Sequence, residues 1–205
     1  MLTIIPLFYI LFNSLYYSTD MKLIFTLGNP EQQYDHTRHN AGFWVADNLA
    51  KEYDASWKNK SKFKCLLIEM KQDNEKVLLA KPTTYYNLVG ESLRSLMNFY
   101  EIPSKDVLII HDDLALPLGV IRTRAGGSDA GNNGIKSVNN YGGRDTYRMR
   151  IGIAADTRTI MGDADFVLGK FDTNEQDILT GQLAKIKLTV EQFLDNKLQT
   201  ATHRI

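Results

Sequence analysis

The sequence predicts an α/β domain with a mixed β-sheet. Three observations support this fold class: strand-like apolar runs alternate with helical spacings of apolar residues, two of the strands are placed to form a hairpin, and one run is apolar at every position. With 205 residues, 43% of them hydrophobic, the chain can bury a single core, and no linker-like stretch divides it.

The first half of the chain supplies strands and helices in alternation. Lys22–Leu27 is a short apolar run that ends at a Gly-Asn-Pro turn, which predicts a strand. Apolar residues recur at helical spacing from Asn40 onward and again over Leu88–Tyr100, so both segments are expected to be amphipathic helices. Between them, Lys62–Met70 and Val77–Lys81 flank a short polar stretch, which predicts the hairpin and makes the sheet mixed.

The second half continues the alternation. Val107–Ile110 is apolar throughout, so we expect a strand that is buried on both faces. Val120–Arg124 and Arg148–Ile153 are further predicted strands, separated by a Gly/Asn-rich loop and a short helix near Gly134–Asn140. The last element, from about Glu175 to Leu198, is expected to be one long amphipathic helix.

Residues 1–20 differ in composition from the rest and contain no Lys or Arg. Their apolar stretch is interrupted by Pro6 and is too short to span a bilayer reliably. Neither the positive start nor the cleavage site of a secretory signal is present. We therefore interpret residues 1–20 as an apolar extension or a mis-assigned start, and residues 21–205 as the domain. A membrane or export segment is the alternative.

Charge and cysteine content exclude several classes of protein. Lys and Arg together number 24 and balance 24 Asp and Glu, which excludes a strongly basic protein that wraps nucleic acid but not a local basic patch. The single cysteine, Cys65, excludes an internal disulfide framework and a cysteine-cluster zinc site. It fits a reducing compartment, and we expect a cytoplasmic protein.

Polar residues gather at the ends of four predicted strands, in residues 28–40, 81–87, 111–113 and 126–134. Sites in open α/β sheets form outside the carboxyl ends of strands, so we expect these segments to converge. Each segment alone also has a structural explanation. Asn40 and Asn87 could be helix N-caps, and a Gly/Asn-rich loop is often only a turn.

The residue types in these segments favour hydrolysis of an acyl bond by an activated water. A His with a carboxylate partner is the usual device for activating water, and Asn side chains can donate hydrogen bonds to a developing oxyanion. No Ser lies in a nucleophile elbow, and Cys65 lies in a predicted strand, where a buried, inert thiol is expected. The alternative is a metal site with the candidate ligands His36, His39, His111 and Asp112. The Glu of the usual zinc-peptidase motif is missing, so we expect no metal and no cofactor.

Basic residues are paired along three predicted strands. Lysines alternate at positions 58, 60, 62 and 64, so an extended strand would place all four on one face. Arg122 and Arg124 share a face by the same spacing, as do Arg148 and Arg150. In a chain without net charge, such pairs would suit a phosphate-bearing substrate. A solvated strand face for the lysines and structural ion pairs for Arg148 and Arg150 are the alternatives.

A set of motifs in this sequence resembles bacterial-type peptidyl-tRNA hydrolase. The resemblance covers the chain from Met21 onward, in order, and the Thr-Arg-His-Asn block at residues 37–40 is highly specific in that context. The matching residues are Leu27-Gly28-Asn29-Pro30, Tyr34, Thr37–Phe43, Lys81–Thr84, Asn87, His111–Leu114, Leu116, Pro117, Gly119, Arg150–Ile153 and Phe166–Phe171.

The resemblance implies a fold, an activity and a set of site residues. The fold would be a single globular domain with a twisted mixed β-sheet surrounded by helices. The protein would act as a monomer, away from membranes, on the ester between a peptide and the 3′ end of tRNA. His39 would be the general base, Asp112 would orient it, and Asn29 would lie beside the ester. The residues implied to hold peptide or tRNA are Tyr34, Tyr86, Asn87, Asn133, Arg122, Arg124 and Arg150.

The sequence departs from the family's usual residues at a few positions. Asn132 stands where a His is usual, Tyr86 where Met is common, Thr26 where Gly is common, and Asp129 adds an acidic side chain to the glycine-rich loop. We expect these changes to affect tRNA contacts more than hydrolysis. A non-catalytic RNA-binding relative and a metal-dependent amidase or peptidase are the alternative functions. The intact His39–Asp112 pair argues against the first, and the second would lose activity on chelation.

Overall fold

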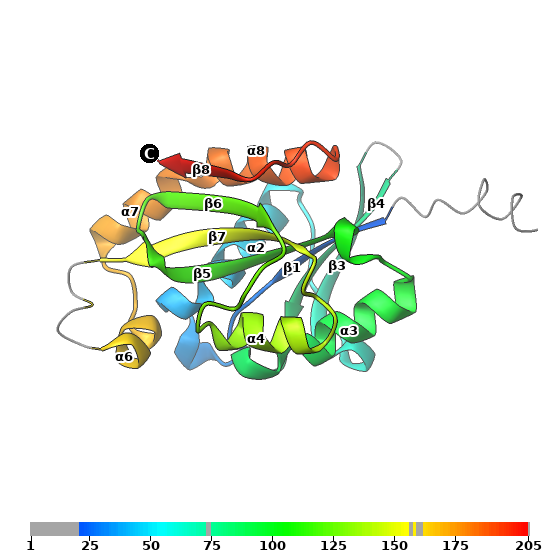
Figure 1. Cartoon of the computed structure of the whole chain (residues 1–205), viewed down its shortest axis with the longest axis horizontal. Helices are drawn as coiled ribbons and strands as arrows, with labels where there is room; N and C mark the ends of the chain where they lie inside the picture. The colour runs from blue at the N-terminus through cyan, green and yellow to red at the C-terminus, as the bar shows by residue number, and fades with distance from the viewer. Residues whose placement is uncertain (1–20, 73–74, 156–157, 159–161, 205) are drawn as a thin grey trace, which may run out of the picture.

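The computed structural model describes residues 21–72, 75–155, 158 and 162–204 (Figure 1). The predicted extension, residues 1–20, lies outside these ranges. Of the helices that the structure describes, none has the length and apolar character that a bilayer-spanning segment needs.

A mixed eight-stranded sheet forms the centre of the molecule, with the order β2-β3-β4-β1-β5-β7-β6-β8. Its central strands β4, β1, β5 and β7 are parallel, whereas β3 pairs antiparallel with β2 and β4, and β6 pairs antiparallel with β7 and β8. This arrangement confirms the predicted mixed α/β fold. The strands are β1 (Met21–Thr26), β2 (Lys58–Lys60), β3 (Cys65–Gln72), β4 (Glu75–Pro82), β5 (Val107–Pro117), β6 (Val120–Ala125), β7 (Tyr147–Ala154) and β8 (Ala201–Arg204).

Helices cover both faces of the sheet and bury a core on each (Figure 1). In β1 and β5 successive side chains point to opposite faces, so Ile24 belongs to one core and Leu23 and Phe25 to the other. This double burial explains why the run Val107–Ile110 in β5 is apolar at every position, as predicted. The helices are α2 (Ala41–Glu52), α3 (Val89–Tyr100), α4 (Asn133–Asn140), α6 (Asp163–Leu168), α7 (Thr173–Gly181) and α8 (Leu183–Leu194). Helices α2 and α8 contribute to one core, and α3 and α4 to the other.

Two predicted elements differ from those in the structure. Strand β5 does not end at Ile110 but runs to Pro117, because its parallel pairing with β7 continues through Asp113, opposite Gly152. The segment predicted as one C-terminal helix is two helices, α7 and α8, joined at the fully buried Gln182, and the chain then adds the edge strand β8 beside β6.

The alternating lysines do not lie on one continuous strand. Strand β2 ends at Lys60, the 3-10 helix η3 (Ser61–Phe63) follows, and Lys64 has a left-handed backbone with φ 51°. Two of the lysines pair with carboxylates, Lys60 with Glu69 and Lys64 with Glu91. These contacts support the interpretation of the lysines as a solvated surface.

Candidate active site

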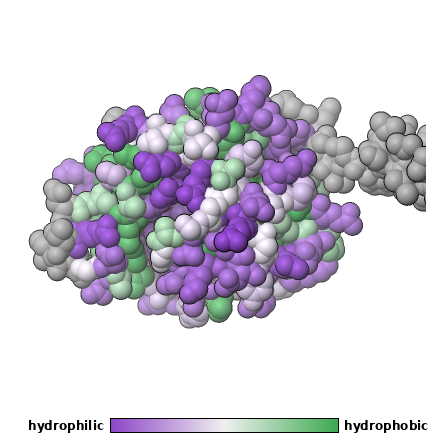
Figure 2. All heavy atoms as spheres, in the orientation of Figure 1, coloured by the Kyte–Doolittle hydropathy of each residue, from purple (hydrophilic) through white to green (hydrophobic). Residues whose placement is uncertain are grey.

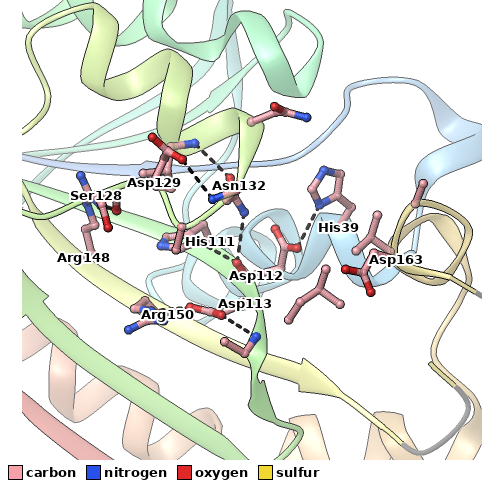
Figure 3. A pocket seen from close by; sticks show the side chains of 18 of the residues that line it. His39, His111, Asp112, Asp113, Ser128, Asp129, Asn132, Arg148, Arg150 and Asp163 are labelled. Atoms are coloured by element: carbon pink, nitrogen blue, oxygen red, sulfur yellow. Dashed lines mark hydrogen bonds and ion pairs between the residues drawn. The ribbon is translucent and has the colours of Figure 1, made fainter. Parts of the chain in front are cut away.

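Three of the four predicted polar segments contribute residues to one cavity of about 430 Å³ (Figure 3), whereas segment 81–87 lies outside its lining. Its walls come from the 3-10 helix η2 (Arg38–Asn40), from the carboxyl half of β5, from the glycine-rich loop, and from β7 and α6. Hydrophilic side chains cover much of the middle of this face of the molecule (Figure 2). The lining includes His39, His111, Asp112, Asp113, Arg124, Asp129, Asn132, Asn133, Arg148, Arg150 and Asp163.

His39 and Asp112 form a hydrogen-bonded pair at one end of the cavity (Figure 3). His39 Nδ1 lies 2.9 Å from Asp112 Oδ2, and the Asp112 side chain is 2% exposed against 17% for His39. Burial acts to raise the pKa of Asp112, but the charge interaction and hydrogen bond with His39, together with the hydrogen bond from Tyr86, hold it below its usual value. The carboxylate is therefore ionised and fixes the proton of the neutral imidazole on Nδ1, which leaves Nε2 as the basic atom.

Tyr86 lies under this pair. Its ring stacks on His39 with centroids 3.6 Å apart and an interplanar angle of 21°. Its hydroxyl donates to Asp112 Oδ1 at 2.5 Å and accepts from Asn132 Nδ2 at 3.0 Å. Burial and the charge of Asp112 raise the pKa of Tyr86 well above its usual value, so the hydroxyl keeps its proton. Tyr86 is buried beneath His39 rather than on the open wall of the cavity.

Asn29 is held in place by hydrogen bonds to both its backbone and its side chain. The Asn40 side chain accepts from the backbone N–H of Asn29 at 2.8 Å and donates to its carbonyl at 2.9 Å, while Asn29 Oδ1 accepts from the backbone N–H of Tyr86. Among the described residues, Nδ2 of Asn29 has no hydrogen-bond acceptor. Asn40 occupies the N-cap position of α2, as one interpretation expected, but its side chain makes no capping hydrogen bond there. It holds Asn29 instead, a positioning role that was missed from the sequence.

The other predicted amide residues divide into two groups. Asn133 opens α4 and lines the cavity, next to Asn132, whose Oδ1 caps the helix by accepting from Ile135 N–H at 3.0 Å. Asn87 lies in the 3-10 helix η4 (Tyr86–Leu88), is exposed, and makes no cap for α3, so its N-cap interpretation is wrong. Tyr34 is half-buried at the end of η1 (Gln32–Tyr34), outside the cavity lining.

Three of the four paired arginines line the cavity. Arg148 is 2% exposed and donates to the carbonyls of residues 127 and 128 and to Asn139. Burial and repulsion by Arg124 and Arg150 lower its pKa to about 10. Arg150 pairs with Asp113, as the alternative interpretation expected. Arg122 lies outside the lining and donates to Thr202 on β8.

His111 is buried beside the pair and is held neutral. Its Nδ1 lies 2.7 Å from the carbonyl of Asp112, and burial lowers its pKa to about 4. Of the alternative metal ligands, His39, His111 and Asp112 line this cavity, whereas His36 is exposed and lines a different one. Within the described ranges, no group of three or more His, Cys, Asp or Glu side chains is arranged to hold a metal ion.

Arg38, next to His39, anchors η2 to the C-terminal helices. Its guanidinium donates from Nη2 to both Glu175 oxygens at 2.8 and 2.6 Å and from Nη1 to the carbonyl of Lys170 at 2.7 Å. It also lies 4.3 Å from the ring centre of Phe166. Glu175 in turn completes a capping box with Asp172 at the start of α7. No pattern in the sequence indicated this role for Arg38.

Comparisons with known proteins agree with the geometry. The family model described as peptidyl-tRNA hydrolase matches residues 23–205. A peptidyl-tRNA hydrolase from Rickettsia bellii (strain RML369-C) is 40% identical over 179 residues, which is 87% of this chain and 96% of that protein. One from Gloeobacter violaceus is 42% identical over 183 residues, covering 89% of this chain and 92% of that protein. The crystal structure of peptidyl-tRNA hydrolase from Acinetobacter baumannii matches with a TM-score of 0.75 at 35% identity, over 89% of this chain and 96% of that one.

Proposed function

Because the chain belongs to the peptidyl-tRNA hydrolase family and hydrolyses the ester bond of peptidyl-tRNA, we propose that His39 and Asp112 activate the attacking water. The reaction releases free peptide and free tRNA. The observation that carries the proposal is the contact between His39 Nδ1 and the buried Asp112 carboxylate, since it leaves Nε2 as the base in a cavity that also holds amide and arginine side chains.

In the proposed mechanism, His39 Nε2 accepts a proton from water as the oxygen attacks the ester carbonyl. The imidazolium that forms is stabilised by Asp112, which stays ionised. When the tetrahedral intermediate collapses, the 3′ oxygen of tRNA leaves and takes a proton from the imidazolium. A base of this kind contributes on the order of 10²–10⁴-fold to the rate.

We assign the carbonyl oxygen and the peptide to the amide side chains. Asn29 has a free amide N–H₂ group, and its backbone is fixed by Asn40, so it is suited to donate to the oxyanion or to position water. Asn133 lines the cavity that contains His39 and is proposed to hold the intermediate, whereas Asn29 lies outside the lining. Tyr34 and Asn87 lie beyond the lining, and we propose them as contacts for the parts of the substrate that extend outside the cavity.

The arginines are proposed to hold tRNA phosphates. Arg124 and Arg150 line the cavity that contains His39, and both repel the guanidinium of the buried Arg148, whose pKa is lowered by its burial and by these two neighbours. A phosphate group would relieve this repulsion. Arg122 lies on the same strand as Arg124 and is proposed to contact the tRNA farther out.

We further propose that the protein acts as a monomer in the cytoplasm. Peptidyl-tRNA arises where translation takes place, and Cys65 is a free, buried thiol whose pKa burial raises to about 12, which fits a reducing compartment. Size-exclusion chromatography with light scattering should give a mass near 23.3 kDa. A stable dimer mass would contradict the monomer.

The test is release of labelled N-acylated aminoacyl group from tRNA by the full chain, with His39→Ala alongside. We expect turnover that EDTA does not change and that the substitution lowers by at least about a hundredfold. Loss of activity in EDTA would favour the metal-dependent alternative. Tight tRNA binding without turnover in both proteins would favour the non-catalytic RNA-binding alternative.

A further inference from the structure

The Asp112 carboxylate is shared by two hydrogen-bond donors on its two oxygens. His39 Nδ1 lies 2.9 Å from Oδ2, and the Tyr86 hydroxyl lies 2.5 Å from Oδ1. The Asp112 side chain is 2% exposed, so water does not compete effectively for it. How strongly the carboxylate attracts a proton on His39 therefore depends on how strongly Tyr86 holds the other oxygen.

The direction of the Tyr86 hydrogen bond follows from its neighbours. Asn132 Oδ1 accepts from the backbone N–H of Ile135, which fixes the orientation of the amide. Its Nδ2 then faces the Tyr86 oxygen at 3.0 Å, and an amide nitrogen can only donate. The hydroxyl must accept from Asn132 and so points its own proton at Asp112.

Tyr86 is also fixed as a rigid body. Its backbone N–H donates to Asn29 Oδ1, and its ring stacks on the imidazole of His39. On the α4 side the ring has room only because residue 134 is glycine, since a Cβ there would lie 2.4 Å from Tyr86 Cε1. The Tyr86 side chain is therefore held in a single rotamer, in which its hydroxyl reaches Asp112.

We propose that Tyr86 is a positioning residue that acts through Asp112 on His39, holding the carboxylate in place and reducing the share of its charge that the imidazole feels. This inference rests on the proposed function, in which His39 is the base. Its consequence is that hydrolysis persists to lower pH than it would with an Asp112 carboxylate that lacks the Tyr86 hydrogen bond.

The ionisable groups that face the pair come from several elements. They line the same cavity: His111 and Asp113 on β5, Arg124 on β6, Arg148 and Arg150 on β7, Asp129 in the glycine-rich loop, Arg158, and Asp163 on α6. The test leaves all of these groups unchanged, so a difference between variants reports the Tyr86 hydroxyl alone.

The test compares the full chain with its Tyr86→Phe variant, which removes the hydroxyl and keeps the stacked ring. The readout is the pH dependence of kcat/KM for hydrolysis of N-acylated aminoacyl-tRNA. We expect the acid limb, the low-pH side of this profile along which kcat/KM falls, to move to higher pH by about half a unit or more. At a pH on this falling side, kcat/KM of the variant is then about threefold lower than that of the parent. The matched control is Tyr85→Phe, the same change at the adjacent position, where the exposed hydroxyl donates to Glu31. We expect its profile to overlay that of the parent.

A second variant tests the same chain of hydrogen bonds from its far end. Asn132→Ser keeps an oxygen that can cap α4 but removes the donor to Tyr86. We expect an acid-limb shift in the same direction and smaller than that of Tyr86→Phe. Thermal unfolding of each variant shows whether it is folded under the assay conditions.

Two results would overturn the inference: unshifted acid limbs in both Tyr86→Phe and Asn132→Ser, or a shift in Tyr85→Phe as large as that in Tyr86→Phe. If Tyr86→Phe does not fold, the acid-limb shift of Asn132→Ser alone tests the inference. Full activity of His39→Ala would instead contradict the proposed function, so the two failures are distinguishable.

Discussion

Replacing Arg38 by Ala should destabilise the fold by about 3–5 kcal/mol. The Arg38 side chain is 8% exposed and that of Glu175 10%, and the pair is joined by two hydrogen bonds. The substitution leaves the Glu175 carboxylate buried without its cation and removes the hydrogen bond to the Lys170 carbonyl. For a chain of this size, the expected loss corresponds to a fall in Tm of about 6–20 °C.

The assay is urea unfolding of the full chain, followed by tryptophan fluorescence, for Arg38→Ala, Glu175→Ala and the double variant. Because the two side chains are in contact, their coupling energy should be about 2 kcal/mol or more, with the double variant less destabilised than the sum of the singles. Glu175→Ala also loses the capping box. This cost is present in both the single and the double variant, so it cancels when the coupling energy is calculated from the double-mutant cycle. Additivity within about 0.5 kcal/mol would refute the reasoning.

Three further predictions concern packing, pH and tRNA binding. Gly42→Ala should lower the free energy of unfolding by about 1–3 kcal/mol, because its Cβ would lie 2.5 Å from the carbonyl oxygen of Leu27; an unchanged urea midpoint would count against this. The pKa of His111 is lowered to about 4 in the folded state, so the unfolded chain binds more protons between pH 4 and 6.5 and stability falls as pH falls through this window. His111→Asn should flatten that dependence in urea unfolding at pH 5 and pH 7, and an equal slope in both proteins would contradict it. Arg124→Ala should weaken tRNA binding and reduce the slope of log K against log salt by about one, measured by filter binding, and an unchanged slope would remove Arg124 from the phosphate contacts.

The central strands could be predicted because burial on both faces demands an apolar residue at every position. Val107–Ile110 shows this pattern and forms the middle of the sheet. The extension of β5 through His111 and Asp112 could not be predicted in the same way. These residues are polar and resemble the end of a strand, yet their backbones still pair with β7. Likewise β8 is short and polar, and only its pairing with β6 makes it a strand.

The site followed from the sequence in part. His39, Asp112 and Asn133 were expected to come together from different strand ends, and the structure places all three around one cavity. The contacts that hold them depend on residues far apart in the chain, such as Tyr86 with Asn132, and on which donor reaches which oxygen. Only the packed structure supplies that information. In the sequence, Tyr86 and Asn132 are two separate departures from the residues usual in the family. Nothing in the sequence indicates that the two side chains are in contact.

The attachment of η2 to the C-terminal helices has a consequence for how the protein is made. While it is being synthesised, the chain is itself a peptide esterified to tRNA, and so belongs to the class of molecule that the finished enzyme cleaves. The ion pair that anchors the turn bearing His39 joins Arg38 to Glu175, so it can form only after most of the 205 residues have been joined. We therefore expect the turn to gain this anchor, and the chain its hydrolase activity, only late in synthesis.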